Sequence, residues 1–255
     1  MSTKDILRGE LITKEFDGRK VLEEVSFSLK EGELLCLLGV SGVGKTTLFN
    51  ILSGISKPDS GRVLLQTAEG EEENWQEITG KSGYLSYMLQ KDLLLPHKFV
   101  IDNVALPLVL KGMRKTEARE KAEVYFKQFG LAGYEKKYPA ELSGGMRQRA
   151  ALLRTFLQGN RVALLDEPFS ALDTITKTAM QEWYLQVMEE IKLSTIFITH
   201  DIDEAILISD RILIMKGNPA KLSEDVIIEK EKPRNQDFLL TEEFLSYKRK
   251  IREML

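Results

Sequence analysis

The fold of this 255-residue chain is set by one stretch, Leu34-Leu35-Cys36-Leu37-Leu38-Gly39-Val40-Ser41-Gly42-Val43-Gly44-Lys45-Thr46. Its first five residues are apolar without alternation, as in a strand buried on both faces of a parallel sheet. The next eight match the phosphate-loop pattern at every fixed position, where a strand passes into a helix. In such loops the glycines let backbone N–H groups face the phosphates, Lys45 adds charge, and the Thr46 hydroxyl can ligate Mg²⁺. A plain glycine-rich turn is the alternative, and the strand–loop–helix setting argues against it.

Two further apolar runs end in residues that can do chemistry. The run 162–165 leads into Asp166-Glu167-Pro168, and the run 195–198 leads through Thr199 to His200. A strand end there would place Asp166 beside a phosphate-bound Mg²⁺ and Glu167 toward an attacking water. By itself an Asp-Glu pair is often a solvated strand end, and a lone histidine is often a plain loop residue. After a phosphate loop, the pattern favours the metal-holding and general-base roles.

The pattern along the rest of the chain indicates an α/β fold. We expect the runs 34–38, 162–165 and 195–198 to lie side by side in a parallel sheet, with helices over 118–129 and 180–191. Alternation over 11–16 and 25–29 predicts an antiparallel edge. Residues 69–73 are acidic and read as a solvated loop. A strand at 226–228 and a final helix from Thr241 are also expected, with acidic residues in the helix's first turn and basic residues later.

These elements divide the chain into four predicted segments. Residues 1–90 form the first part of an ATPase core with the antiparallel edge and phosphate loop, and residues 91–158 form an inserted helical lobe. Residues 159–215 complete the core, and residues 216–255 form a C-terminal extension that ends in a helix. The predicted fold class is a phosphate-loop NTPase (RecA-like) with a mixed sheet, an antiparallel β edge and an inserted α-helical lobe.

Composition limits the partners and the compartment. The 36 basic and 39 acidic residues give a net charge of -3, so no overall field favours nucleic acid or an anionic membrane. No apolar run reaches the length of a membrane span, and the start of the chain, Met1–Glu10, is polar. Cys36 lies in an apolar run with no basic neighbour, which indicates a buried structural thiol. We therefore expect a cytoplasmic protein that does not bind nucleic acid.

A resemblance to a known family follows from Leu142-Ser143-Gly144-Gly145-Met146-Arg147-Gln148-Arg149, which is similar to the signature motif of ABC ATPases. The rest of the family pattern follows in order, from about residue 10 to the C-terminus. Phe16 stands where an aromatic residue stacks on adenine, and Gln90 fits the Q-loop. Ser170-Ala171-Leu172-Asp173 resembles the D-loop, and Thr199-His200-Asp201 resembles the switch-histidine segment.

The resemblance implies a homodimer in which two subunits meet head to tail and share each ATP. Ser143 and the glycines after it would open a helix whose N-terminus has no phosphate to bind within its own monomer. It implies catalytic roles for Lys45, Gln90, Glu167 and His200, and metal binding by Thr46, Gln90 and Asp166. ATP binding is implied for Phe16, Gly39, Val40, Ser41, Gly42, Val43, Gly44, Lys45, Thr46 and Thr47. Leu142, Ser143, Gly144, Gly145 and Met146 would act in trans, and Asp173 in communication across the dimer. The cofactors are ATP and Mg²⁺.

The branch of the family is indicated by Leu93-Leu94-Leu95-Pro96 after Gln90, by the Met-Arg form of the signature, and by Pro233-Arg234 before the final helix. These features resemble importers of nitrate, sulfonate, taurine and pyrimidine precursors. The branch usually has a tyrosine where Phe16 stands and an aromatic where His97 stands, which leaves the solute open.

The implied function is the ATP-hydrolysing subunit of a membrane transporter, peripheral on the inner face of the cell membrane. Its partners would be integral membrane permease subunits, docked at an apolar groove near 93–96, and a solute-binding protein. Two alternatives are a non-transport ABC ATPase and a nucleotide-sensing regulatory subunit. The single cassette and lone Cys36 disfavour the first. The presence of Glu167 and His200 disfavours the second.

Overall fold

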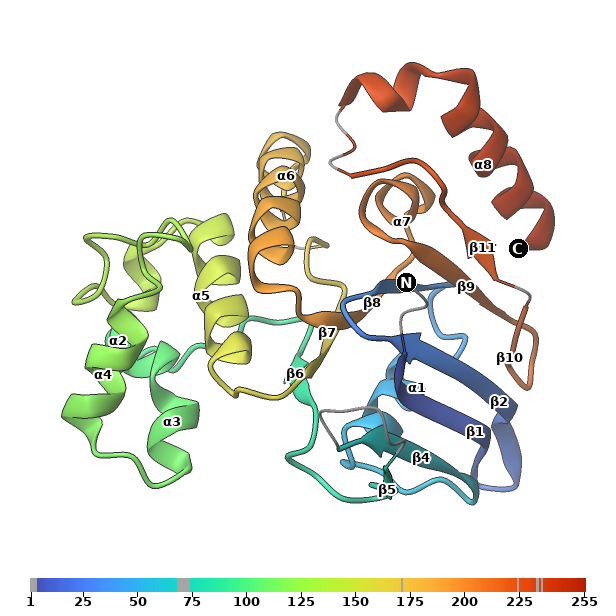
Figure 1. Ribbon diagram of the computed structural model, residues 1–255, viewed down its shortest axis with the longest axis horizontal. Helices are drawn as coiled ribbons and strands as arrows, with labels where there is room; N and C mark the ends of the chain where they lie inside the picture. The colour runs from blue at the N-terminus through green and yellow to red at the C-terminus, as the bar shows by residue number, and fades with distance from the viewer. Residues whose placement is uncertain (1–3, 68–73, 171, 224, 233, 235) are drawn as a thin grey trace.

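The computed structural model describes residues 4–67, 74–170, 172–223, 225–232, 234 and 236–255 (Figure 1). The expected acidic loop at 69–73, the start of the chain at 1–3, Ala171 of the D-loop and Pro233 lie outside these ranges. The strands are β1 (Asp5–Phe16), β2 (Arg19–Lys30), β3 (Leu34–Leu38), β4 (Ser60–Gln66), β5 (Trp75–Glu77), β6 (Ser86–Met88), β7 (Val162–Asp166), β8 (Ser194–Thr199), β9 (Arg211–Lys216), β10 (Lys221–Leu222) and β11 (Val226–Ile227). The helices are α1 (Lys45–Leu52), α2 (Val100–Val104), α3 (Leu106–Leu110), α4 (Lys115–Glu123), α5 (Gly144–Phe156), α6 (Thr174–Ile191), α7 (Ile202–Ile208) and α8 (Glu242–Met254), with 3₁₀ turns η1 (Pro139–Glu141) and η2 (Gln236–Leu240).

The central sheet has the strand order β10-β9-β3-β8-β7-β6, with β11 paired to β9. Its inner pairs are parallel: β3 lies between β9 and β8, and β7 lies between β8 and β6. The three apolar runs predicted to lie side by side are therefore neighbours. Because parallel strands end at one edge, the loops that follow β3, β7 and β8 come together.

The predicted antiparallel edge forms a sheet of its own. β1 pairs with β2 and with β4, and β5 continues from β4, giving the order β2-β1-β4-β5. The strands β4 and β5 were not expected from the sequence. This second sheet lies beside α1, and both pack against one face of the central sheet (Figure 1).

Two hydrophobic cores lie on opposite faces of the central sheet. Along β3, Leu34, Cys36 and Leu38 face one core while Leu35 and Leu37 face the other. The first core joins the sheet to the helical lobe, α6, α7 and α8, and the second joins it to α1 and the antiparallel sheet. Burial on both faces explains why these strands are apolar without alternation. Cys36 is fully buried, as predicted.

The stretch between β6 and β7 carries helices α2 to α5 and no strand, and Figure 1 shows it as a lobe beside the sheets. The segment boundaries at residues 90, 158 and 215 stay predictions. The helix expected over 118–129 is shorter than expected, because α4 ends at Glu123. Beyond it the chain tightens into turns in which the Tyr125 and Phe126 N–H groups donate to carbonyls three residues back. Phe126 and Phe129 are nevertheless buried.

The C-terminal extension has the two elements expected of it. The strand expected at 226–228 is β11, and the final helix α8 begins at its N-cap Thr241, whose hydroxyl accepts from Phe244 N. Figure 1 shows α8 alongside α7. Phe244 and Ile251 join the first core, together with residues of α7, so the extension packs against the element that follows β8.

Candidate functional site

The phosphate loop links β3 to α1. Gly44 is the N-cap residue of α1 and has φ 116°, a conformation that side-chain-bearing residues rarely adopt. A Cβ on Gly39 would lie 2.6 Å from the backbone oxygen of Met215, so the start of the loop has no room for a side chain. The sequence therefore needs glycine at these two positions for different reasons, one conformational and one steric.

The Lys45 ammonium lies inside this loop. Nζ donates to the carbonyl oxygens of Gly39 at 2.6 Å and of Val40 at 2.9 Å. Only 5% of the residue is exposed, and burial lowers its pKa, while the nearby carboxylates of Glu167 and Asp166 act in the opposite direction. A partly desolvated cation next to turned-in backbone groups is an arrangement suited to phosphate oxygens.

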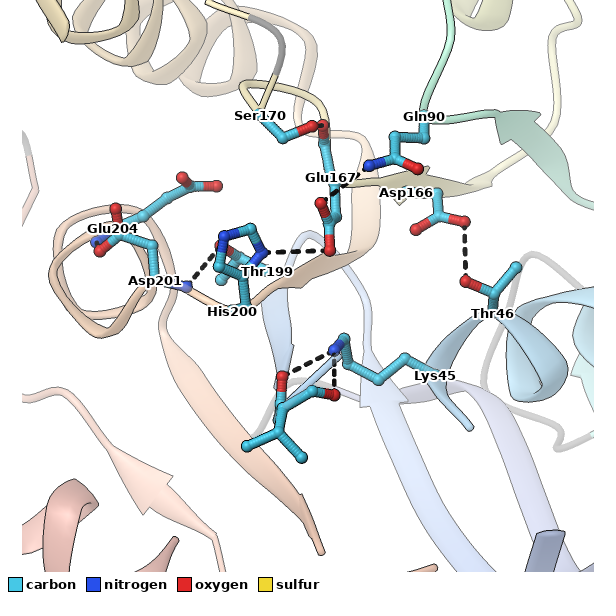
Figure 2. A network of polar contacts seen from close by, with 12 residues as sticks. Lys45, Thr46, Gln90, Asp166, Glu167, Ser170, Thr199, His200, Asp201 and Glu204 are labelled. Carbon is cyan, nitrogen blue, oxygen red and sulfur yellow. Dashed lines mark hydrogen bonds and ion pairs between the residues drawn. The ribbon is translucent and has the colours of Figure 1, made fainter. Parts of the chain in front are cut away.

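Asp166, at the end of β7, faces α1. Its Oδ2 accepts from the Thr46 hydroxyl at 3.3 Å and from the Tyr87 hydroxyl at 3.3 Å (Figure 2 shows the first contact). The carboxyl is 5% exposed, and burial raises its pKa. Two of the three residues expected to hold the metal, Thr46 and Asp166, thus meet, while Gln90 does not contact them. Tyr87 was missed because no motif marks it: it reaches the site from β6 only through the pairing of β6 with β7.

Glu167 adopts a backbone conformation that is rare for a residue other than glycine, with φ 46°. Its N–H donates to the carbonyl oxygen of Ile198 on β8 at 3.1 Å, and its own carbonyl oxygen accepts from Ser170 N at 3.2 Å and Ser170 Oγ at 3.0 Å. Contacts on both sides therefore hold the strained residue. Strain of this kind is concentrated at functional sites.

The Glu167 carboxylate lies between two of the other predicted site residues. Gln90 Nε2 donates to Oε2 at 3.0 Å, and His200 Nδ1 lies 3.1 Å from Oε1 (Figure 2). The His200 side chain is 52% exposed and the Glu167 side chain 15%. Gln90 is thus brought to Glu167, while Thr46 is the residue brought to Asp166. The neighbouring carboxylates of Asp166 and Glu167 therefore bind different side chains.

The segment after His200 is held by polar contacts. The Asp201 N–H donates to the Thr199 hydroxyl at 3.0 Å, and Asp201 Oδ1 accepts from Asp203 N and Glu204 N at the start of α7. Lys177 of α6 pairs with Asp201 at 2.7 Å and with Glu204 at 2.9 Å. The histidine therefore stands on a short link between a buried strand and an anchored helix.

The signature segment lies elsewhere, at the start of α5. The Ser143 hydroxyl accepts from Met146 N at 3.3 Å and caps that helix. A Cβ on Gly145 would lie 3.0 Å from Thr176 Cγ2, so the second glycine permits close packing of α5 on α6. Asp173 caps α6 through Thr176 N at 3.1 Å. Local packing therefore explains why the second of the two glycines, Gly145, has no side chain.

Phe16 stands at the end of β1 and is 48% exposed, with Lys14 Nζ 5.2 Å from its ring centroid. Its accessible face leaves it able to stack on a planar ligand. A cavity of about 330 Å³ lies at Val40–Val43 of the phosphate loop, with Met215–Asn218 and Leu255 on its other wall. The C-terminal residue is thus a neighbour of the loop, which no sequence signal indicated.

The apolar groove expected at 93–96 differs from the prediction. Leu94 is 7% exposed and belongs to the first core, so it is not available to a partner. Asn103 holds the turn beside it, since its side chain accepts from Leu95 N at 2.6 Å and donates to Leu95 O at 3.1 Å. The exposed apolar residues near Gln90 are Leu89 at 40% and Leu93 at 53%.

Comparison with known proteins agrees with this geometry. The family model described as ABC transporter matches residues 22–170. This chain belongs to the ABC transporter family. The chain is 40% identical over 217 residues to the formylaminopyrimidine import ATP-binding protein ThiZ of Halalkalibacterium halodurans, and the match covers 85% of this chain and 82% of that protein. It is 37% identical over 232 residues to the aliphatic sulfonates import ATP-binding protein SsuB of Bacillus cereus, covering 91% of this chain and 87% of that protein.

A solved structure gives the same fold and activity class. The dimeric post-hydrolysis state of the ATP-binding cassette MJ0796 bound to ADP and Pi matches with a TM-score of 0.72 at 25% identity, covering 89% of this chain and 100% of that chain. The ABC chain described here is therefore an ATPase with a phosphate-loop NTPase core and an inserted helical lobe. Among its described residues, no helix has the length and apolarity required to cross a membrane.

The buried Asp166 carboxyl yields a prediction on stability. Its pKa is higher folded than unfolded, so its stabilising contribution is full below the unfolded pKa, near 4, and is lost as pH rises through the folded pKa. Asp166→Asn removes the buried charge. We expect the variant to gain about 0.5–2 kcal/mol of unfolding free energy at pH 7 and to lose this gain in acid.

Urea denaturation at pH 7 and pH 4 measures the effect. Asp17→Asn, at an exposed position, is the matched control and should change stability by less than about 0.5 kcal/mol. An Asp166→Asn variant that is less stable than the unmodified protein at pH 7 would contradict the account of this carboxyl.

Proposed function

We propose that two copies of this ABC ATPase bind and hydrolyse Mg-ATP at shared sites and thereby drive an integral membrane permease. One observation carries the proposal: the Glu167 carboxylate is held by Gln90 and His200, next to a separate Asp166–Thr46 pair. One acidic residue thus has a hydroxyl partner suited to a shared metal ion, and the next has partners suited to a reacting water. A site that only binds nucleotide would not need two carboxylates with separate roles.

The residues at the phosphate loop fit Mg-ATP. The Asp166 carboxylate and Thr46 hydroxyl supply the oxygen ligands that Mg²⁺ prefers, and the Gln90 amide oxygen is a third candidate. When bound, the ion would neutralise charge on the phosphates. Backbone N–H groups of Gly39–Thr47 and the Lys45 ammonium would bind the β- and γ-phosphates, with Lys45 exchanging its loop carbonyl partners for phosphate oxygens. Phe16 would stack on the adenine ring.

Glu167 is the proposed general base. It would take a proton from the attacking water, while His200 steadies that water and the γ-phosphate and Gln90 orients the carboxylate. The strained backbone at Glu167 supports this role, because it fixes the direction of the side chain before the substrate arrives. Lys45 and the N-terminus of α1 would stabilise the negative charge of the transition state.

The second subunit would complete each site. The N-terminus of α5 carries the exposed Ser143 as its cap and has half-buried Gly144 in its first turn, so Leu142–Met146 of a second copy can present backbone N–H groups to the γ-phosphate. Asp173, at the start of α6, would transmit the state of one site to the other. The dimeric state of the MJ0796 cassette supports a pair of subunits.

The exposed surface around Gln90 is the proposed permease dock. Leu89 and Leu93 flank Gln90, and Arg154 of α5 donates to the Leu93 carbonyl oxygen at 2.9 Å, so this surface is linked to the signature helix. A change at Gln90 could then reach both the permease and the lobe. The protein would therefore work at the inner face of the cell membrane, from the cytoplasm.

The transport direction and the solute are inferred from the names of related proteins alone. Both ThiZ and SsuB are named as import proteins, which favours an importer served by a solute-binding protein. Their solutes differ, since one name specifies formylaminopyrimidine and the other aliphatic sulfonates. We propose a small solute such as a pyrimidine precursor, sulfonate, taurine or nitrate.

Glu167→Gln tests the assignment of the base. The amide keeps the shape of the carboxylate and cannot take the proton, so kcat should fall at least about a hundredfold, about 2.7 kcal/mol of barrier. ATP affinity should be unchanged, and size-exclusion chromatography in ATP should show a persistent dimer. Glu182→Gln, on an exposed position of α6, is the control. Normal turnover by Glu167→Gln would disprove the role.

Leu93→Glu tests the dock. A carboxylate at this exposed position should leave the fold and ATP binding intact while disfavouring burial against an apolar permease surface. The yield of co-purified permease should fall at least about tenfold, equivalent to about 1.4 kcal/mol. Leu110→Glu, 78% exposed elsewhere on the lobe, is the matched control. Equal recovery of permease by both variants would place the interface elsewhere.

A further inference from the structure

Arg234, in the C-terminal extension, is a buried cation bound to backbone carbonyls. It is 4% exposed. Nη1 donates to Ile206 O at 2.7 Å and to Ser209 O at 2.6 Å. Nη2 donates to Ile228 O at 3.2 Å and Nε to Lys230 O at 2.8 Å. One side chain thus joins the end of α7 to the strand and turn that follow β10.

Two of these contacts supply hydrogen bonds to carbonyl groups at the end of α7. The last carbonyls of an α-helix have no partner within it, and a cation there also complements the helix dipole. No ion pair of Arg234 with a carboxylate is seen among the described residues, and burial lowers its pKa to about 10. Several short, directed carbonyl contacts offset the cost of burying this charge, and they fix where α7 ends.

The other end of α7 is held by the same extension. Lys248 of α8 pairs with Asp203, in the first turn of α7, at 2.5 Å. Phe238 and Phe244 form a T-shaped pair, with ring centroids 5.5 Å apart, in the core that also contains Ile206. The extension therefore contacts α7 at both ends, through Arg234 at its last carbonyls and through Lys248 at its first turn.

α7 begins two residues after His200. Asp201 caps the helix, and its N–H donates to Thr199, so His200 is fixed between the end of β8 and the start of α7. The imidazole Nδ1 lies 3.1 Å from Glu167 Oε1. A rotation of α7 would move the backbone on one side of His200 and alter that distance.

We propose that Arg234 is a positioning residue for ATP hydrolysis: by binding the last carbonyls of α7 it sets the orientation of that helix and holds His200 against Glu167. The inference rests on the proposed role of His200. The C-terminal extension then contributes to catalysis without contacting nucleotide.

The test compares Arg234→Ala, His200→Ala and the double variant in the full-length protein. Single-turnover kinetics resolve low rates, and ATP affinity is measured separately. We expect His200→Ala to lower the hydrolysis rate about a hundredfold or more. Arg234→Ala should lower it about tenfold, with ATP affinity changed less than about threefold. The double variant should be no slower than His200→Ala, because residues that act in series are not additive. Arg234→Lys should recover part of the rate.

A second pair of variants applies even if Arg234→Ala does not fold. Lys248→Ala removes the ion pair with Asp203 in the first turn of α7 and should slow hydrolysis about threefold. Lys250→Ala, at an exposed position of the same helix, should not slow it. Circular dichroism melting checks that both variants are folded.

The outcomes separate the two proposals. Normal hydrolysis by His200→Ala would refute the proposed role of His200, and with it the positioning role. A slow His200→Ala variant combined with an unimpaired, folded Arg234→Ala variant would refute the positioning role alone. So would a double variant markedly slower than His200→Ala, since Arg234 would then act by another route. If Arg234→Ala is unfolded, equal rates for Lys248→Ala and Lys250→Ala would refute it.

Discussion

The parallel register of β3, β8 and β7 is the constraint on which the rest of the structure depends. Leu38 lies opposite Thr199, and Ile198 lies opposite Asp166. The residues that follow these pairs, in the phosphate loop and at Glu167 and His200, are therefore delivered to one edge of the sheet, where His200 lies 3.1 Å from Glu167 and Thr46 lies 3.3 Å from Asp166. A slip of one residue would turn Asp166 to the other face and separate it from Thr46. Burial of all three strands on both faces makes such a slip costly.

Local patterns made this part of the molecule predictable from sequence. Unbroken apolar runs mark strands buried on both faces, and the loop from Gly39 to Thr46 has strict steric needs, so both predictions hold. Features that depend on distant contacts could not be predicted. Leu94 was expected to line an exposed groove but packs into the first core. The helix expected at 118–129 ends at Glu123, and Phe126 and Phe129 reach the same core from the turns that follow. The contacts of Arg234 could not be predicted, since two of its carbonyl partners, Ile206 and Ser209, lie 28 and 25 residues earlier in the chain.

The site is assembled at some cost to stability. Asp166 is a buried acid with a raised pKa, Lys45 a buried base with a lowered one, and Glu167 has a strained backbone. Surrounding contacts from β8, from Ser170 and from the loop carbonyls hold these groups in place. Such features are expected where a site is pre-organised for a charged substrate. In our proposal the C-terminal extension contributes to this pre-organisation, because it fixes α7, the helix that directly follows His200.

We propose that each ATP site is built from two chains. Mixing Lys45→Ala with Ser143→Arg tests it most directly, because each homodimer lacks one component at both sites. The mixed dimer has one site with both defects and one with neither. We predict two inactive homodimers and, on equal mixing, recovery of ATPase activity toward about a quarter of the unmodified sites. Full activity of Ser143→Arg alone would contradict the claim, since the signature helix would then make no contact with nucleotide.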